Sequence, residues 1–318
     1  MNVTHHRDVT GVIVTRNTCA FTCAAIRSVE ESRGGLSTEV VVVDNGSTDD
    51  TGAALARDFP AAKYIRSATN LGFARANNLG AKDSSAEFIL LLNSDARLKT
   101  DSLATAVAWL RAHPECGIVG AQLLNPDGSR QNSIANFPTL ATELLNKSLL
   151  RRLFPRRFPG KEQHYDSAVE VETVIGAFML IRGDLWRALG GFDERYFFFF
   201  EETDFCLQVR RRGAKIFHLP QIEVWHEQGG SAKTVFVGAR IEYWRSRYFY
   251  FRKNHGTLAR IVLAIGLGLR LLVDVLISAL AVLVTLGRSP RWRDKFRVQA
   301  GVIRWHCAGC PASLGLPR

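Results

Sequence analysis

Hydrophobic and polar residues alternate along the first 125 residues as short apolar runs and amphipathic stretches. The apolar runs are rich in Val, Ile and Leu and have the length of β-strands, whereas the amphipathic stretches have the length of helices. We predict strands at residues 8–15, 39–43, 62–66, 88–92 and 117–123, and helices at about 18–31, 49–59, 74–81 and 100–113. Strands that alternate with helices are typical of a mostly parallel, doubly wound α/β sheet with helices on both faces.

Two of these strands end in polar side chains. Asp44 and Asn45 follow residues 39–43, and Asn93, Ser94 and Asp95 follow residues 88–92. Open α/β sheets bind ligands at the carboxyl edge of the strands, and a carboxylate there is a hard ligand suited to Mg²⁺ or Mn²⁺ beside phosphate. The same residues also fit a simpler alternative, a polar strand end at which Asp95 begins the next turn.

The second half of the chain places carboxylates directly after an aromatic run. Residues 196–200 are all aromatic, and Glu201, Glu202 and Asp204 follow at the start of a helix predicted over residues 205–212. The helix dipole favours an acidic first turn, which accounts for one or two of the three, but three close carboxylates repel unless a cation or hydrogen bonds hold them. We also predict strands at 173–181, 215–219 and 222–225, the last of which ends at His226.

The net charge of +11 lies in the C-terminal quarter of the chain. Residues 240–318 contain 14 basic and 3 acidic residues, whereas residues 1–239 contain 27 of each. This neutral larger part, without a recognised binding motif, argues against nucleic-acid binding, and the lack of G-x-G-x-x-G after the first strand argues against a dinucleotide-dependent dehydrogenase. The basic residues 147–163 are expected to form an irregular loop, either solvated or in contact with an anionic acceptor or membrane.

Residues 258–286 are apolar except for Arg260, Arg270 and Asp274. A spanning helix needs ~20 apolar residues, but each central charge costs ~2.5–3.5 kcal/mol on insertion scales. Arg270 and Asp274 are four residues apart and can pair on one helix face. The sequence leaves open whether this segment spans a membrane, lies on it or forms a core helix pair. Because basic and aromatic residues flank it on both sides, we expect residues 240–318 to hold the protein at a membrane surface.

Five blocks, in the right order, resemble the family 2 nucleotide-sugar glycosyltransferases, inverting enzymes of the GT-A fold. The blocks are residues 43–49, 70–77, 93–95, 176–182 with 190–194, and 200–204. Residues 125–129 and the basic tail resemble, within that family, bacterial rhamnosyltransferases of cell-surface polysaccharide assembly. The resemblance implies a GT-A domain at 1–239, with a donor half at about 8–125 and an acceptor half at about 126–239, followed by a membrane-associating, apolar helical region at 240–318.

The resemblance also implies roles for individual residues. Asp95 would hold the divalent metal ion, with His226 either a second ligand or a structural residue, and Glu202 would be the catalytic base. The implied donor-binding residues are Thr15, Asn17, Asp44, Asn45, Asn70, Gly72, Arg75, Asn93, Ser94 and Asp95, and the acceptor-side residues are Gly176, Ala177, Glu201 and Asp204. Two residues depart from the family pattern: Asn93 replaces the first acid of D-x-D, and Glu202 replaces the Asp of E-D-x-D.

We therefore expect a metal-dependent, inverting transferase that moves a sugar, with L-rhamnose from dTDP-rhamnose as first choice. Its acceptor would be a hydroxyl of a lipid-linked or polysaccharide glycan in bacterial cell-envelope synthesis. The alternatives are another UDP- or GDP-sugar as donor, or a catalytically weak nucleotide-sugar-binding module. Residues 1–10 contain no apolar signal segment, and six cysteines in 318 residues form no dense framework. We expect the protein at the cytoplasmic face of the inner (plasma) membrane. The sequence is also compatible with an oligomer.

Overall fold

The computed structural model describes residues 7–154, 165–227 and 236–318. Contacts along the chain divide it into two compact units. The unit that contains the sheet, called the sheet unit, comprises Met1–Phe137, Gly160–Phe197 and Glu201–Ser231. The other, called the helical unit, comprises Pro138–Pro159, Phe198–Phe200 and Ala232–Arg318.

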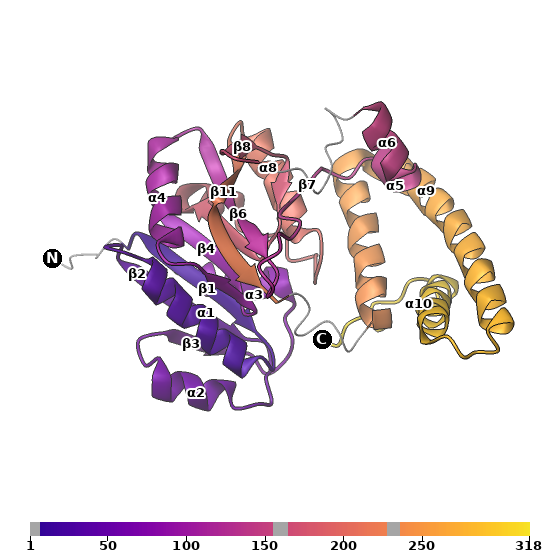
Figure 1. The fold of residues 1–318 in the computed structure, drawn as a ribbon, viewed down its shortest axis with the longest axis horizontal. Helices are drawn as coiled ribbons and strands as arrows, with labels where there is room; N and C mark the ends of the chain where they lie inside the picture. Colours follow the sequence, from indigo (N-terminus) through magenta and orange to yellow (C-terminus); the bar gives the residue numbers. More distant parts are fainter. Residues whose placement is uncertain (1–6, 155–164, 228–235) are drawn as a thin grey trace. The chain divides into compact units, whose positions relative to one another are not determined.

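A mixed, nine-stranded sheet forms the centre of the sheet unit within the described residues (Figure 1). Its order is β3-β2-β1-β4-β10-β6-β11-β5, and β8 pairs with β11. Parallel neighbours are β3 (Lys63–Arg66), β2 (Thr38–Asp44), β1 (Val9–Thr15) and β4 (Phe88–Asn93), as well as β6 (Cys116–Leu124) with β11 (Lys215–His226). Antiparallel pairs are made by β10 (Phe178–Arg182) with β4 and β6, and by β5 (Ala96–Leu98) and β8 (Val169–Glu170) with β11. The predicted mostly parallel α/β sheet is confirmed.

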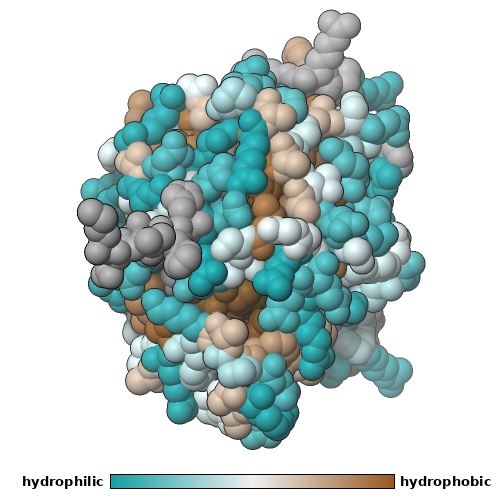
Figure 2. Space-filling model, turned by 90° about the vertical axis from the view of Figure 1, so that its left-hand side faces the viewer, coloured by the Kyte–Doolittle hydropathy of each residue, from teal (hydrophilic) through white to brown (hydrophobic). Residues whose placement is uncertain are grey.

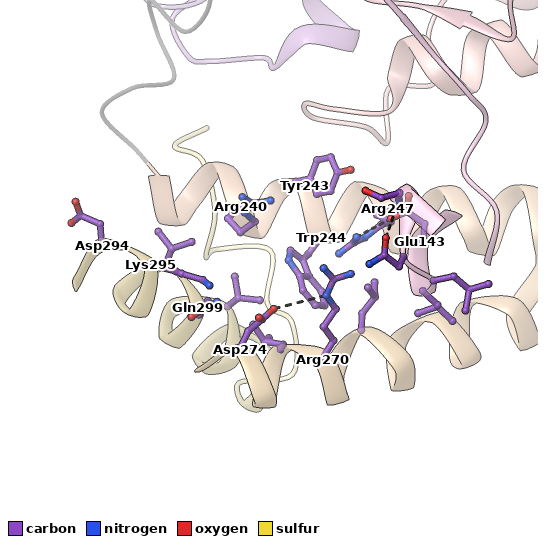
Figure 3. Close-up of a pocket in the computed structure, with 18 residues that line it drawn as sticks. Glu143, Arg240, Tyr243, Trp244, Arg247, Arg270, Asp274, Asp294, Lys295 and Gln299 are labelled. Carbon is purple, nitrogen blue, oxygen red and sulfur yellow. Dashed lines mark hydrogen bonds and ion pairs between the residues drawn. The ribbon is translucent and has the colours of Figure 1, made fainter. Parts of the chain in front are cut away.

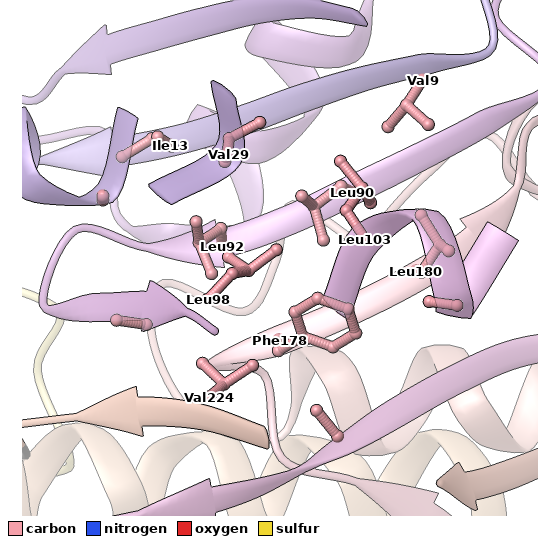
Figure 4. Packing of buried hydrophobic residues seen from close by; sticks show 14 of the residues in the cluster. Val9, Ile13, Val29, Leu90, Leu92, Leu98, Leu103, Phe178, Leu180 and Val224 are labelled. Carbon is pink, nitrogen blue, oxygen red and sulfur yellow. The ribbon is translucent and has the colours of Figure 1, made fainter. Parts of the chain in front are cut away.

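Helices pack on both faces of this sheet because its strands alternate their apolar side chains. Side chains of β1, β4, β5, β10 and β11 on one face meet α1 (Cys19–Ser32) and α4 (Ser102–Ala112) in the buried core (Figure 4). On the other face, α3 (Phe73–Ala81) approaches so closely that a Cβ at Gly80 would lie 2.4 Å from Cγ1 of Val12. Three further helices are α2 (Thr51–Asp58), α7 (Gly183–Leu189) and α8 (Glu201–Arg211).

Three expected strands differ from the observed ones. The run at 173–181 is interrupted around Gly176, and its two parts become β9 (Thr173–Val174), which pairs with β7 (Ile134–Ala135), and β10 of the main sheet. The strands expected at 215–219 and 222–225 are a single strand, β11. Its register against β6 shifts between Leu219 and Glu223, around Pro220, because proline has no N–H to donate to the ladder.

The helical unit contains α5 (Leu140–Leu144), α6 (Lys147–Leu153), α9 (Phe236–Val284) and α10 (Pro290–Cys307). Gly256 has φ 88° and interrupts α9, dividing it into a first arm, residues 236–255, and a second arm, residues 257–284. Asn146 caps α6 by accepting hydrogen bonds from the backbone N–H of Ser148 and Leu149. The loop expected at 147–163 is therefore helical over Lys147–Leu153, and residues 155–163 lie outside the described residues. The expected helices of the C-terminal region are present as α9 and α10.

Candidate active site at the carboxyl edge of the sheet

The pairing register brings polar strand ends to one edge of the sheet unit. Thr15 at the end of β1 lies opposite Asp44 of β2, and Val14 lies opposite Asn93 of β4. The last residue of β11, His226, pairs with Ala96 of β5, directly after Asp95. Four strands thus deliver polar side chains to the edge at which open α/β sheets bind their ligands.

The two predicted metal ligands lie beside each other at this edge. Nε2 of His226 is 3.5 Å from Oδ1 of Asp95 and 3.5 Å from Nδ2 of Asn93. The backbone N–H of Glu227 donates to the carbonyl oxygen of Asp95 at 3.0 Å, which ties the two segments together. In the described part of the chain, no group of three or more His, Cys, Asp or Glu side chains is suited to hold a metal ion.

Gln131, a residue that sequence reasoning missed, determines which ring nitrogen of His226 carries the proton. Its Nε2 donates to the backbone carbonyls of His226 and Leu124 and to Oδ1 of Asn125, so its Oε1 is the atom that lies 3.0 Å from Nδ1 of His226. An amide oxygen only accepts hydrogen bonds, so Nδ1 is the protonated nitrogen. In the neutral ring, Nε2 then carries the lone pair, and it lies 3.5 Å from both Nδ2 of Asn93 and Oδ1 of Asp95.

This arrangement fits a divalent cation. A ring nitrogen and a carboxylate oxygen lie 3.5 Å apart, and this combination of imidazole and carboxylate ligands is one that divalent cations such as Mn²⁺ accept. A donor set of one carboxylate and one imidazole leaves most coordination positions for water and diphosphate oxygens, as is usual for ions that act beside phosphate. Asp95 and His226 are the side chains that would hold the ion.

Asp44 is almost completely buried, with 1% of its surface exposed. Its Oδ1 accepts a hydrogen bond from the backbone N–H of Ser47 at 2.8 Å, and its Oδ2 accepts one from the hydroxyl of Tyr64 at 2.6 Å. Burial and the contact with Asp44 raise the pKa of Tyr64 to about 12. Tyr64, which was also missed, orients a carboxylate whose remaining lone pairs can still accept from a ligand.

Three asparagines of the predicted donor set hold the neighbouring loops in place. Asn17 accepts from the backbone N–H of Thr48, Asn45 donates to the carbonyl of Gly72, and Asn70 accepts from the N–H of Gly72. Gly72 has φ 79°, and a Cβ there would lie 2.3 Å from the carbonyl oxygen of Phe197. Only glycine fits this position.

A buried group of hydroxyls is hydrogen-bonded to the loop that contains Ser94 and Asp95. Oγ1 of Thr18 donates to Oγ of Ser94 at 3.1 Å and lies 3.0 Å from Oγ1 of Thr15. Oγ1 of Thr22 completes the buried group, 2.7 Å from that of Thr15. Thr15 and Ser94 therefore belong to one hydrogen-bonded set that connects β1, α1 and the end of β4.

Arg75 lies apart from this set. Its Nε donates to Oε2 of Glu194 at 3.3 Å, and 61% of its side chain is exposed. It lines a cavity of about 640 Å³ with residues of α3, α7 and the loop 190–194. No other predicted donor or metal residue lines that cavity, so the structure does not bring Arg75 into the Asp95–His226 group.

The three carboxylates at the start of α8 differ in accessibility. Glu201 and Asp204 are only 4% and 2% exposed, whereas Glu202 is half-buried. The exposed part of Glu202 does not include Oε2, which is buried and has no hydrogen-bond partner among the described residues, and this burial raises the pKa of its carboxyl. Gly176 lies beside it, since a Cβ at Gly176 would be 3.7 Å from Cβ of Glu202. The carbonyl oxygen of Ala177, next to Gly176, accepts a hydrogen bond from the backbone N–H of Asn93 at 3.1 Å. Gly176 and Ala177 therefore lie between the start of α8 and the end of β4.

Solved structures with a similar fold include glycosyltransferases. A mannosyltransferase from Pyrobaculum calidifontis in complex with GDP-Man and Mn²⁺ is 19% identical, with a TM-score of 0.56 over 96% of this chain and 87% of that chain. TarS 1–349 of S. aureus in complex with UDP is 15% identical, with a TM-score of 0.53 over 95% and 72% of the two chains. These similarities confirm the predicted GT-A fold.

Curated relatives align with more than half of this chain, and a family model covers most of the sheet unit. The N-acetylglucosaminyl-diphospho-decaprenol L-rhamnosyltransferase of Mycobacterium tuberculosis is 26% identical over 232 residues, which are 68% of this chain and 75% of the relative. The rhamnosyltransferase WbbL of Escherichia coli is 24% identical over 191 residues, 58% and 71% of the two chains. The model of glycosyl transferase family 2 matches residues 10–187, more than half of the sequence, and the chain therefore belongs to that family.

Proposed function

We propose that the protein is an inverting, metal-dependent rhamnosyltransferase of bacterial cell-envelope glycan synthesis. It would transfer L-rhamnose from dTDP-rhamnose to a hydroxyl of a lipid-linked or polysaccharide acceptor. The observation that carries the proposal is the meeting of Asp95 and His226, 3.5 Å apart at the carboxyl edge of the sheet. Membership of glycosyl transferase family 2 limits the reaction class, and two relatives named as rhamnosyltransferases support the choice of sugar.

The residues at the sheet edge would bind and orient the donor. Asp44 would accept a hydrogen bond from an N–H of the pyrimidine base, held in position by Ser47 and Tyr64. Asp95 and His226 would hold the divalent ion between themselves and the diphosphate. When bound, this ion stabilises the negative charge that builds on the leaving diphosphate.

Glu202 would act as the general base on the acceptor side. As the acceptor hydroxyl attacks the anomeric carbon, its proton would pass to the carboxylate of Glu202, while the bond between sugar and diphosphate breaks on the opposite face. This single displacement inverts the anomeric configuration. The raised pKa of Glu202 makes its carboxylate a stronger base, and a positioned base typically contributes ~10²–10⁴-fold to the rate.

The second arm of α9 would keep the enzyme on the cytoplasmic face of the membrane. Over the described residues, α9 is the one helix long and apolar enough to cross a membrane by length and composition, and 17% of its most apolar stretch is buried. Fractionation of cells that express the full chain tests this part. We expect the protein in the membrane fraction at low salt, and recovery in the soluble fraction without detergent would contradict it.

Donor turnover by the purified full chain tests the reaction itself. The protein would be incubated with dTDP-L-rhamnose and, separately, with UDP- and GDP-sugars, with Mn²⁺ or with EDTA. No glycan acceptor is present, so water would attack the anomeric carbon in its place; we expect this hydrolysis to release dTDP from dTDP-L-rhamnose with Mn²⁺ and not with EDTA. Equal release with EDTA would exclude the metal-dependent mechanism, and binding without turnover of any donor would favour a nucleotide-sugar-binding module.

A further inference from the structure

The helical unit contains a cavity of about 1080 Å³ that the proposed reaction does not use (Figure 3). Its walls are the two arms of α9, α10 and the segment from α5 to α6. Figure 3 shows Arg240, Trp244 and Arg247 on the first arm, with Arg270 and Asp274 on the second arm across from them. A volume of this size is sufficient for a ligand.

The second arm of α9 places Arg270 and Asp274 on the side of this cavity, beside two buried leucines, and a row of exposed apolar residues on the opposite side. Leu267, Arg270, Leu271 and Asp274 line the cavity and recur at the spacing of one helix face. The opposite face carries Ile265, Leu269, Leu272, Leu276 and Leu280, each 54–70% exposed. A helix of a water-soluble protein has the reverse arrangement, whereas charged residues in membrane segments face an interior or a cavity and pair there.

Two cations of the cavity have no carboxylate partner. Glu143 pairs with Arg247 at 3.0 Å, Asp274 pairs with Arg270 at 3.9 Å, and Asp294 pairs with Arg297 at 3.0 Å. In the described part of the chain, Arg240 and Lys295 form no ion pair; Arg240 lies over the ring of Tyr243 and Lys295 over the ring of Trp292. The cavity therefore has a local excess of positive charge.

Arg247 adds a second sign of an anionic ligand. Its side chain is 9% exposed, and its Nε is buried without a hydrogen-bond acceptor among the described residues. Buried N–H groups of arginine are nearly always paired, and the guanidinium group suits phosphate oxygens. Apolar walls from Leu144, Val298 and Val302 accompany these cations. The chemistry that matches both features is a phosphate attached to an apolar chain.

We infer that this cavity binds the phosphate headgroup of an anionic membrane lipid, whose chains lie along the exposed apolar face of the second arm. The inference rests on the proposed membrane association of α9 and adds a defined site to it. Arg240 and Lys295 would bind the headgroup from the first arm and α10. The second arm, residues 257–284, is roughly 40 Å long at ~1.5 Å per residue, sufficient to accommodate lipid chains along its length.

Vesicle binding by the full chain tests this inference. The cavity variant Arg240→Gln/Lys295→Gln would be compared with the matched variant Arg291→Gln/Arg293→Gln, which removes two exposed cations of α10 that do not line the cavity. All four side chains are exposed, so folding is expected to be retained, and circular dichroism checks it. Binding would be measured on phosphatidylcholine vesicles with and without phosphatidylglycerol, in about 0.5 M salt, where charges are screened beyond roughly 4 Å.

We expect the cavity variant to lose tenfold or more of its affinity for phosphatidylglycerol vesicles, and the matched variant to lose twofold or less. Equal losses in both variants, or none in the cavity variant, would overturn the lipid site while leaving membrane association intact. If the unmodified chain bound neither kind of vesicle, both the proposed lipid site and the proposed membrane association would be contradicted.

Fluorescence of Trp244, which lines the cavity, gives a readout from the site itself. The difference between the unmodified chain and Trp244→Phe isolates its signal. We expect phosphatidylglycerol vesicles to shift this signal in the unmodified chain and not in the cavity variant. If inorganic phosphate alone produced the same shift, the ligand would be a free anion and the lipid assignment would be wrong.

Discussion

The sheet unit and the helical unit distribute apolar residues in opposite ways. In the sheet unit, Leu90 and Leu92 of β4 are at most 2% exposed, and the face of the molecule in Figure 2 carries mostly hydrophilic residues with hydrophobic patches between them. In the helical unit, Leu276 and Leu280 are 70% and 62% exposed, while Arg270 and Asp274 line a cavity. Burial of apolar surface stabilises a fold in water by ~25 cal/mol per Å². The exposed apolar face of the second arm of α9 gains none of this stabilisation in water, which indicates that this face is adapted to an environment other than water.

The two units also differ in how their polar side chains are partnered. At the carboxyl edge of the sheet, several polar side chains are hydrogen-bonded to one another, as in the group of Gln131, His226 and Asn93. In the helical unit, Arg240 and Lys295 lie on a cavity wall without a carboxylate partner among the described residues. The first arrangement fixes a geometry, and the second leaves charge for a ligand.

The largest expected effect in the sheet unit concerns Glu202. Glu202→Gln keeps the size of the side chain but cannot accept a proton, so we expect the transfer rate to fall ~10²–10⁴-fold with donor affinity nearly unchanged. Glu201→Gln and Asp204→Asn, made side by side in steady-state assays, should retain more activity but lose thermal stability, because both side chains are buried. If Glu202→Gln stayed active and one of these two variants lost activity, the catalytic base would be assigned to the residue changed in the inactive variant.

Stability measurements contrast the two units directly. Leu90→Ala removes a side chain with no exposure and should lower the free energy of unfolding by ~2–5 kcal/mol. Leu276→Ala, at a residue that is 70% exposed, should change it by less than ~0.5 kcal/mol. Denaturant titration of both variants in the same buffer measures the difference. Comparable losses would mean that the outer face of α9 is packed in solution.

Replacement of Gln131 tests how the His226 ring is oriented. Gln131→Leu removes the acceptor for Nδ1 of His226, and we expect Mn²⁺ affinity to fall ~10–100-fold, as is usual when a ligand histidine loses its supporting contact. ¹⁵N NMR of metal-free protein should show a single His226 tautomer, protonated at Nδ1, that becomes mixed in the variant. Gln221→Leu, the same change at an exposed position of β11, is the control and should alter neither measurement.

The smallest of these effects is a shift of a pH profile. Burial raises the pKa of Glu202 above its ordinary value of 4.5, and a base acts only when it is deprotonated. We therefore expect kcat/KM to fall as the pH falls through this raised pKa, with the acid limb above the ordinary carboxyl range. The residual activity of Glu202→Gln should lack this limb. An unchanged limb in that variant would assign the titration to another group.

Much of the sheet could be predicted because its strands are continuous apolar runs. β1, β2 and β4 were located within one or two residues, and their parallel order followed from the alternation of strands and helices. Prediction was wrong where one residue changes a run. Gly176 divides residues 173–181 between two sheets, and Pro220 suggested two strands where β11 continues through a register shift. β5, with three residues of which Arg97 is exposed, lacks a signal in the sequence.

The site was harder to predict than the sheet because it depends on contacts between distant segments. Asp95 stands out because it follows an apolar run, whereas the roles of Asp44 and His226 were implied by the family resemblance; the structure places Asp95 beside His226. Gln131 has no such signal, since it follows a polar turn, and its partner is 95 residues away. Tyr64 reads as an ordinary strand residue, yet its hydroxyl binds Asp44. The role proposed for Arg75 rested on the family motif, and its pairing with Glu194 could not be foreseen.

The central claim is that Asp95 and His226 hold the ion that serves the leaving diphosphate. Titration of Mn²⁺ into the full chain with dTDP present, followed by the EPR signal of free Mn²⁺, tests it most directly. We expect one site in the unmodified protein, loss of that site in Asp95→Ala, and an unchanged site in Asp83→Ala, a carboxylate whose side chain is 74% exposed. Undiminished Mn²⁺ binding in Asp95→Ala would contradict the claim.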